Sequence, residues 1–171
     1  MEQTCCFTGH RPDKLPFGGR EQHPDCLELK ERLAGEIIAM REQGITRFLS
    51  GMALGTDLWA AEAVLRLKQR DPGVALVAVI PFTGQASRWS PRNRRRYEAV
   101  LAQADETVLI RPYYTSGCMF ERNRFLVEHA AHMIAVYDGT PGGTAYTVGY
   151  ARQLERHIVL IDPGKCQKNR Q

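Results

Sequence analysis

The chain has 171 residues, 43% of them hydrophobic and 25% charged, which is the composition of one globular domain with a full core. Its longest apolar stretch, Val74 to Pro81, is too short to cross a bilayer. With no secretory signal pattern at the start, we expect a cytoplasmic protein that has no membrane partner. Five cysteines without a C-x-x-C pair argue against a disulfide framework or a structural zinc site. The net charge of +4 suits a small anionic ligand or nucleic acid and selects neither.

Apolar runs and helical periodicities alternate along the whole chain. The predicted strands are Thr4–Thr8, Arg47–Ser50, Val74–Pro81, Glu106–Ile110, Met133–Tyr137 and His157–Ile161. The predicted helices are Asp25–Gln43, Thr56–Arg70, Pro91–Gln103, Phe120–Ala131 and Thr144–Glu155. Strands joined through helices indicate an α/β fold with a mostly parallel sheet and helices on both faces. We expect a single domain over residues 1–164 and a flexible tail over 165–171.

Glycine, hydroxyl and basic residues follow most of the predicted strands. In a parallel sheet the carboxyl ends of the strands share one edge, where ligands gather. The first such loop, TGHRP, supplies Thr8, Gly9, His10 and Arg11. The other four are SGMALGTD, PFTGQASRW, RPYYTSG and DGTPGGTAYT. Together they predict a ligand site at this edge.

The stretch SGMALGTD, residues 50–57, has the order strand, glycine turn and helix. After Ser50, a positive φ at Gly51 would let the backbone approach a ligand, and the helix that begins near Gly55 favours an anion. Thr56 can cap this helix or bind a phosphate. Asp57 would repel a phosphate, so it either accepts sugar hydroxyls or stabilises the helix start. The alternative is a plain glycine turn between two core elements.

The loop DGTPGGTAYT, which begins at Asp138, has the same order of strand, glycines, hydroxyl and helix. Gly142 and Gly143 allow main-chain amides to point inward, and Thr144 supplies a hydroxyl. A second unit of this kind strengthens the prediction of a phosphate-binding site over that of a turn alone.

The run SRWSPRNRRRY places five arginines near a predicted helix start. The simpler interpretation is a solvated surface. Alternatively, because cations oppose the helix dipole there, a phosphate or a nucleic-acid backbone could offset the cost. Trp89 and Tyr97 would then be stacking groups.

Signals for a metal or a covalent nucleophile are weak. His129 and His132 have no third ligand pattern, and Cys118 has no defined base. We therefore predict no metal and no cofactor.

Several segments together resemble the YpsA-like branch of the SLOG superfamily, which unites the DNA-processing protein DprA/Smf with the Lonely Guy cytokinin-activating enzymes. They are CCFTGHRP, SGMALGTDLWAAE, YEAVLAQAD, FERNRFLVEHA and VYDGTPGGTAYTVGYA. The resemblance extends from about Cys5 to Asp162. It implies a Rossmann-like three-layer α/β/α sandwich and a nucleotide or nucleotide-derived ligand at the strand ends.

The Lonely Guy motifs are only partly present. Arg122 matches the arginine of the family pattern M-x-x-R-K-x-x-M, and Asn123 stands in place of the lysine. The resemblance implies that Arg122 faces a phosphate or a ribose. In P-G-G-x-G-T-x-x-E, Gly149 stands where the family has its glutamate. Losing this carboxylate removes the acid/base group that N-glycosidic cleavage needs, unless Asp57 or Asp138 replaces it.

Three functions follow from these observations. The first is binding or sensing of a nucleotide derivative such as ADP-ribose or NAD. The second is N-glycosidic hydrolysis of nucleoside 5′-monophosphates, and the third is DprA-like binding of single-stranded DNA. A small nucleotide-like ligand is thus the first expected partner, with self-association and nucleic acid left open. The predicted ligand-binding residues are Thr8, Gly9, His10, Arg11, Ser50, Gly51, Gly55, Thr56, Asp57, Arg122, Asn123, Asp138, Gly142, Gly143 and Thr144.

Overall fold

Six parallel strands form the centre of the molecule, in the order β4-β3-β2-β1-β5-β6. The computed structural model describes residues 1–164, so the predicted tail lies outside the described residues. The strands are β1 Thr4–Gly9, β2 Arg47–Ser50, β3 Ala75–Phe82, β4 Glu106–Arg111, β5 His132–Val136 and β6 His157–Ile161. The prediction of a mostly parallel sheet is confirmed, since each neighbouring pair is parallel.

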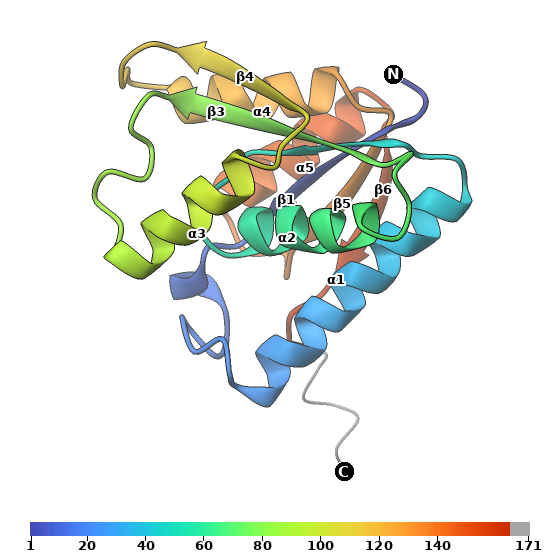
Figure 1. Ribbon diagram of the computed structural model, residues 1–171, viewed down its shortest axis with the longest axis horizontal. Coiled ribbons are helices and arrows are strands. Elements are labelled where there is room, and N and C mark those ends of the chain that lie inside the picture. Colours follow the sequence, from blue (N-terminus) through green and yellow to red (C-terminus); the bar gives the residue numbers. More distant parts are fainter. Residues whose placement is uncertain (165–171) are drawn as a thin grey trace.

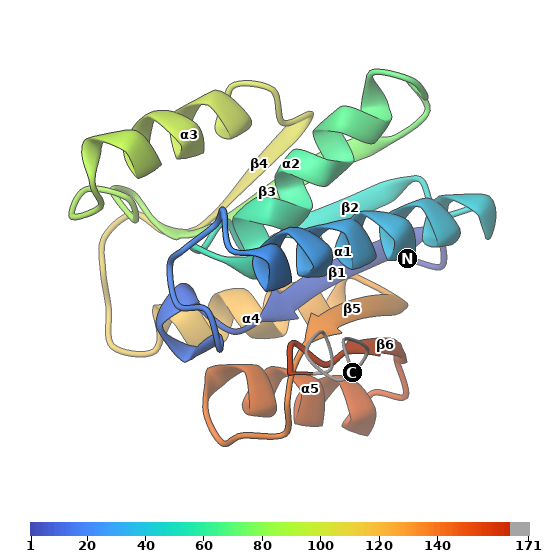
Figure 2. The same cartoon turned by 90° about the horizontal axis from the view of Figure 1, so that it is seen from below.

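Helices cover both faces of this sheet (Figures 1 and 2). They are α1 Pro24–Glu42, α2 Thr56–Lys68, α3 Pro91–Leu101, α4 Cys118–Glu128 and α5 Gly143–Gln153. The first three pack side by side on one face, and α4 and α5 pack together on the other. The Rossmann-like three-layer sandwich is therefore confirmed. Among the helices of residues 1–164, none combines the length and the apolar character that a bilayer crossing requires.

The core consists of two apolar layers, one on each face of the sheet. Cys5 and Phe7 of β1 lie in the layer under α1 and α2, whereas Cys6 lies in the layer under α4 and α5. The alternation follows from the period of two in a strand. Phe7 stacks on Phe48 of β2 with ring centroids 6.0 Å apart. Because helices cover both faces, strands can be apolar at consecutive positions.

Most predicted boundaries differ from the structure by one or two residues, but α4 differs more. It begins at Cys118, two residues before the predicted start at Phe120. The residue before it, Gly117, has a φ of +91° and is therefore not part of the helix. It ends at Glu128, before the predicted end at Ala131. The Ala131 N–H already donates to the Thr4 carbonyl oxygen at 3.2 Å, as part of the approach to β5.

The strand order reverses between β1 and β5. From β1 the chain moves outward to β4 through α1, α2 and α3, and then α4 returns it to β5 along the opposite face. The loops that leave β1 and β5 therefore diverge to opposite faces of the sheet. Such a switch point leaves a crevice at the carboxyl ends of the two strands.

Two histidines lie side by side at the opposite, amino-terminal ends of β5 and β6. From them we expect the folded protein to lose stability in acid. His132 and His157 are register partners with ring centroids 5.3 Å apart. Burial, and then the neighbouring His157, lower the pKa of His132 below its usual value of 6.5. As the pH falls below about 6.5, this histidine takes up a proton more readily in the unfolded chain than in the folded chain. The free energy of unfolding therefore decreases as the pH falls.

We expect His132→Gln to lose less stability than the wild type between pH 7.5 and pH 5, since glutamine does not titrate. Urea unfolding at several pH values measures this difference. Identical pH profiles of the two proteins would contradict the assignment.

Candidate functional site

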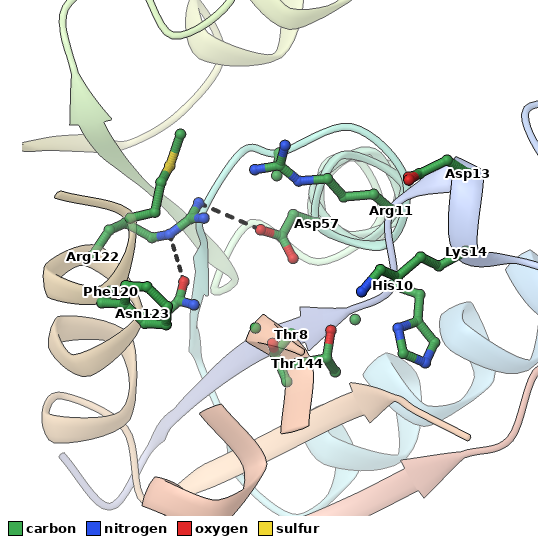
Figure 3. A pocket seen from close by; sticks show the side chains of 14 residues that line it. Thr8, His10, Arg11, Asp13, Lys14, Asp57, Phe120, Arg122, Asn123 and Thr144 are labelled. Atoms are coloured by element: carbon green, nitrogen blue, oxygen red, sulfur yellow. Dashed lines mark hydrogen bonds and ion pairs between the residues drawn. The ribbon is translucent and has the colours of Figure 1, made fainter. Parts of the chain in front are cut away.

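A cavity of about 300 Å³ opens at the switch point between β1 and β5. Its walls come from the segment after β1 and from the first turns of α2, α4 and α5 (Figure 3). The predicted site residues that line it are Thr8, Gly9, His10, Arg11, Asp57, Arg122, Asn123, Gly143 and Thr144. Five loops were expected at this edge, and the loops after β1, β2, β4 and β5 meet around this cavity.

The Arg122 side chain forms one wall and is 4% exposed. Its Nη1 donates to the Gly51 carbonyl oxygen, and its Nε donates to Asn123 Oδ1 at 2.8 Å. Nη1 also lies 3.6 Å from Asp57 Oδ2 (Figure 3). Asn123 in turn donates to Thr147 Oγ1 at 3.0 Å. Arg122 therefore joins α4 to α2 and to the loop after β2.

Asp57, in the first turn of α2, is a buried carboxylate on the cavity wall. Burial raises its pKa, and the charges of Arg122 and Arg11 and the Ala53 N–H oppose this rise. Burial likewise lowers the pKa of Arg122, which Asp57 opposes. A guanidinium stays charged in proteins, so the pair is an ion pair held largely away from water.

The three helices around the cavity begin in a different way from the other two. Side chains cap α1 and α3, since His23 accepts from Asp25 N and Ser90 accepts from Asn93 N. In contrast, α2, α4 and α5 begin at glycines that have positive φ and no side-chain cap. Their first N–H groups are free of side-chain partners, and the positive dipole ends of these helices point to the cavity.

The start of α5 carries the strongest preference for an anion. Its first turn contains no acidic side chain, whereas α2 has Asp57 and α4 has Glu121. Lys14 lies beside this helix start, because a methyl group on Gly142 would be 2.8 Å from its Nζ. Within residues 1–164, Lys14 has no carboxylate partner. A cation at a positive helix end is unfavourable unless an anion joins them.

The hydroxyls of two largely buried threonines complete this end of the cavity. Thr8 is 7% exposed and Thr144 is 9% exposed, and both line the cavity wall (Figure 3). Neither hydroxyl has a hydrogen-bond partner in the part of the chain that the structure describes. Thr8, Thr144 and Lys14, together with the α5 N–H groups, thus surround a space suited to phosphate oxygens.

His10, which lines the cavity, forms a pair with Asp138, which does not. The imidazole points away from Arg122, and its Nε2 lies 2.7 Å from Asp138 Oδ1 (Figure 3). Asp138 also accepts from the backbone N–H and the hydroxyl of Thr140, at 3.0 and 2.7 Å. These bonds, the Thr140 N–H first, lower the pKa of Asp138 to about 2. The pair fixes the loop after β5 to the loop after β1.

Several predicted site residues act within the protein instead of lining the cavity. Ser50 donates to the Asp57 carbonyl oxygen at 2.8 Å, and Thr56 donates to the His10 carbonyl oxygen at 3.3 Å. Both hydroxyls are fully buried, which leaves Thr56 no free hydroxyl for a phosphate. Gly55 has a φ of +88° and lies against the His10 carbonyl oxygen.

The positive φ expected at Gly51 is wrong, since Met52 has it instead, at 57°. Position 51 nevertheless requires glycine, because the Cβ of any other residue would lie 2.1 Å from Arg122 Nη1.

The arginine run near α3 divides into two parts. Arg96 is bound to Glu62 and to Glu21, whose Oε1 lies 2.5 Å from Nη1. Burial opposes ionisation of Glu21, but hydrogen bonds from Arg96 and Lys30 lower its pKa to about 2. The four other arginines of this run, Arg88, Arg92, Arg94 and Arg95, are exposed and have no ion pair within residues 1–164. Nucleic-acid binding by them stays a prediction.

Comparison with known proteins gives the family. The model of the YspA SLOG family matches residues 5–163. The chain belongs to this family. It is 33% identical to a UPF0398 protein of Bacillus licheniformis, over 86% of this chain and 82% of that protein. It is 31% identical to the UPF0398 protein YpsA of Bacillus subtilis, over 86% and 83% of the two chains. The predicted resemblance is therefore confirmed.

Two solved structures share the fold at low identity. DNA processing protein A from Streptococcus pneumoniae superposes with a TM-score of 0.62 at 16% identity, over 97% of this chain. The Helicobacter pylori protein superposes with a TM-score of 0.61 at 16% identity, over 93% of this chain. This SLOG chain spans 55% and 65% of the lengths of those two proteins, so the likeness concerns the fold alone.

Sequence reasoning missed some of the cavity residues. They are Asp13, Lys14, Ala53, Met119 and Phe120. Asp13 and Lys14 lie on the short 3-10 helix η1, Pro12–Lys14, which directly follows the predicted loop TGHRP. A proline at a helix start followed by Asp-Lys is the local signal that extends the loop by these two residues. No group of three or more metal-ligating side chains occurs among residues 1–164.

Asp57→Asn tests the buried ion pair. The substitution keeps the volume but leaves the Arg122 guanidinium buried without its countercharge, so we expect a loss of about 3 kcal/mol in the free energy of unfolding. Asp13→Asn, at an exposed position on the same cavity, is the matched control and should change stability by less than about 0.5 kcal/mol. Urea unfolding measures both. Equal effects of the two substitutions would contradict the role of the pair.

Proposed function

We propose that this protein binds a nucleotide or a nucleotide derivative in the cavity at the carboxyl ends of β1 and β5. One observation carries the proposal: Lys14, which has no carboxylate partner within residues 1–164, lies at the uncapped start of α5, where Thr8 and Thr144 offer unpaired hydroxyls. A phosphate would accept hydrogen bonds from the helix N–H groups and balance the charge of Lys14.

The opposite wall suits a ribose. Asp57 and Asp13 offer carboxylate oxygens, which accept hydrogen bonds from sugar hydroxyls, while Asn123 offers an amide. The dipole at α2 already has Asp57 to balance it, so a neutral, hydroxyl-rich group fits there better than a second phosphate. The anionic and hydroxyl-bearing parts of a nucleotide thus match two different ends of one cavity.

Ligand-dependent stability tests this proposal. We expect AMP and ADP-ribose to raise the melting temperature, since a ligand at 100 times its Kd adds about 2.7 kcal/mol to the free energy of unfolding. Adenosine, which lacks the phosphate, should raise it far less. Lys14→Gln should weaken AMP binding about tenfold, as expected for loss of one charge-assisted hydrogen bond. Calorimetric titration measures the affinities.

Lys68→Gln is the matched control for Lys14→Gln. It removes the same charge from the far end of α2, where Lys68 pairs with Asp105 outside the cavity, and should leave AMP binding unchanged. No rise in melting temperature with any of the nucleotides at millimolar concentration would reject the proposal.

A second candidate function is N-glycosidic hydrolysis of a nucleoside 5′-monophosphate, which Asp57 favours. Gly149 does not line the cavity, but Asp57 places a buried carboxylate on its wall, which is ionised beside Arg122 and can accept a proton from the attacking water as a general base. In this reaction the C1′–N bond breaks, water supplies the hydroxyl to C1′, and the base leaves with a proton.

Incubation with AMP and chromatography of free adenine tests this activity. We expect the wild type to release adenine and Asp57→Asn to release it at least 100-fold more slowly, which is the usual effect of losing a general acid or base. AMP binding by the variant, measured in parallel, separates lost chemistry from lost folding. Release no faster than in buffer would reject the activity and leave the binding proposal standing.

A further inference from the structure

A second cavity, of about 380 Å³, adjoins the first on the side of β3 and α3. Arg11, Asp13, Ala53 and Met119 line both cavities and form their common border. The wall that belongs to the second cavity alone comes from Pro12, Leu54, Gln85 and Trp89. A molecule that fills the first cavity therefore has room to extend past Met119 and Ala53 into the second.

Gln85 carries a hydrogen-bond acceptor that the protein itself leaves unused. The side chain is 8% exposed, and its Nε2 donates to the Gly51 carbonyl oxygen at 3.3 Å. This bond fixes which end of the amide is the oxygen. Oε1 is buried and has no hydrogen-bond partner in the described part of the chain. Leaving such an acceptor unpaired costs about 1–3 kcal/mol, and because Gln85 lines the cavity, a ligand there is the nearest source of a donor from outside the protein.

Trp89 contributes an aromatic side chain to the lining of the same cavity. It is half-buried, and Tyr97 packs against it edge to face, with ring centroids 5.3 Å apart and an interplanar angle of 82°. Tyr97 is itself buried on α3, so the indole orientation is fixed by the core. The other walls are the apolar side chains of Ala53, Leu54 and Met119.

These features define the chemistry of the occupant. Ala53, Leu54, Met119 and the indole favour a flat heterocycle over a sugar or a phosphate, because the charged lining residues, Arg11 and Asp13, lie on the border with the first cavity. The buried, unpaired acceptor of Gln85 favours a heterocycle that carries an N–H group. A nucleobase with an exocyclic amino group, such as adenine, has both properties.

We propose that the cavity of Gln85 and Trp89 holds the base of the nucleotide, with the ring against Trp89 and its amino group donating to Gln85 Oε1. The proposal rests on the nucleotide function proposed above and assigns the base specificity of that site. The phosphate then lies at Lys14 and the start of α5, and the ribose lies near the border of the two cavities.

Removing the amino group from the ligand tests the proposal in the unmodified protein. Purine riboside 5′-monophosphate differs from AMP only in having hydrogen in place of the amino group. We expect the wild type to bind AMP about tenfold more tightly, the value of one hydrogen bond to a buried acceptor. Equal affinities for the two ligands would overturn the proposal, although binding of both would still support the nucleotide function.

Gln85→Met removes the acceptor at nearly constant side-chain length. We expect this variant to bind AMP and the purine analogue equally, at about the affinity of the wild type for the analogue. A ratio of affinities within one variant does not depend on its stability. A variant that still prefers AMP tenfold would overturn the role of Gln85, and no binding of either ligand by the wild type would overturn both proposals.

Tryptophan fluorescence provides a readout that needs no change at Gln85. The chain has two tryptophans, and Trp59 is 2% exposed in the core, away from both cavities. AMP should change the emission of the wild type, while Trp89→Phe, which keeps an aromatic wall, should bind AMP without an emission change. An unchanged response in Trp89→Phe would place the base elsewhere and overturn the proposal.

Discussion

The buried guanidinium of Arg122 is the constraint on which the candidate site depends. It lies at the crevice where the two helical layers separate, and it contacts α2 on one face of the sheet from α4 on the other. Burying an arginine is costly unless its charge is balanced and its N–H groups are bonded. Asp57 supplies the charge, and the Gly51 carbonyl and Asn123 accept hydrogen bonds. Gly51 must lack a side chain because the guanidinium occupies that space.

Because Arg122 is committed to the protein, the cation available to a ligand is a different one. The resemblance to Lonely Guy enzymes implies that Arg122 faces a phosphate or ribose, yet its Nε and Nη1 groups donate to the protein. Arg11 and Lys14 are lining cations that have neither a side-chain hydrogen bond nor an ion pair in residues 1–164, and of the two Lys14 lies beside the helix start that has no acidic side chain. Arg122 and Lys14 therefore have different roles. Arg122, paired with Asp57, shapes the cavity, whereas the unpaired Lys14 favours an anionic ligand.

The fold could be predicted from sequence because its signals are local. Apolar runs such as Met133–Val136 and the alternation with amphipathic helices define a parallel sheet whatever the distant contacts are. The site was predictable to the extent that it follows from topology, since the loops after parallel strands must share an edge. Thr8, Asp57, Arg122 and Thr144 lie together for this reason.

What could not be predicted depends on contacts between distant residues. The hydroxyl of Thr56 looks available in sequence, but the His10 carbonyl 46 residues earlier accepts its hydrogen bond. The same holds for Gly51, whose need to be glycine comes from a side chain 71 residues later. Lys14 escaped prediction because the three-residue η1 has no periodicity, and its position over α5 is set by tertiary packing.

The Gly51 carbonyl oxygen also connects the two cavities. It accepts hydrogen bonds from Arg122 Nη1 on one side and from Gln85 Nε2 on the other. Both donors lie in cavity walls, so a shift of either one alters the strength of the bond to the other through this shared acceptor. The contact with Gln85 that we propose for a nucleobase is therefore separated from Arg122 and its ion pair to Asp57 by this one carbonyl oxygen.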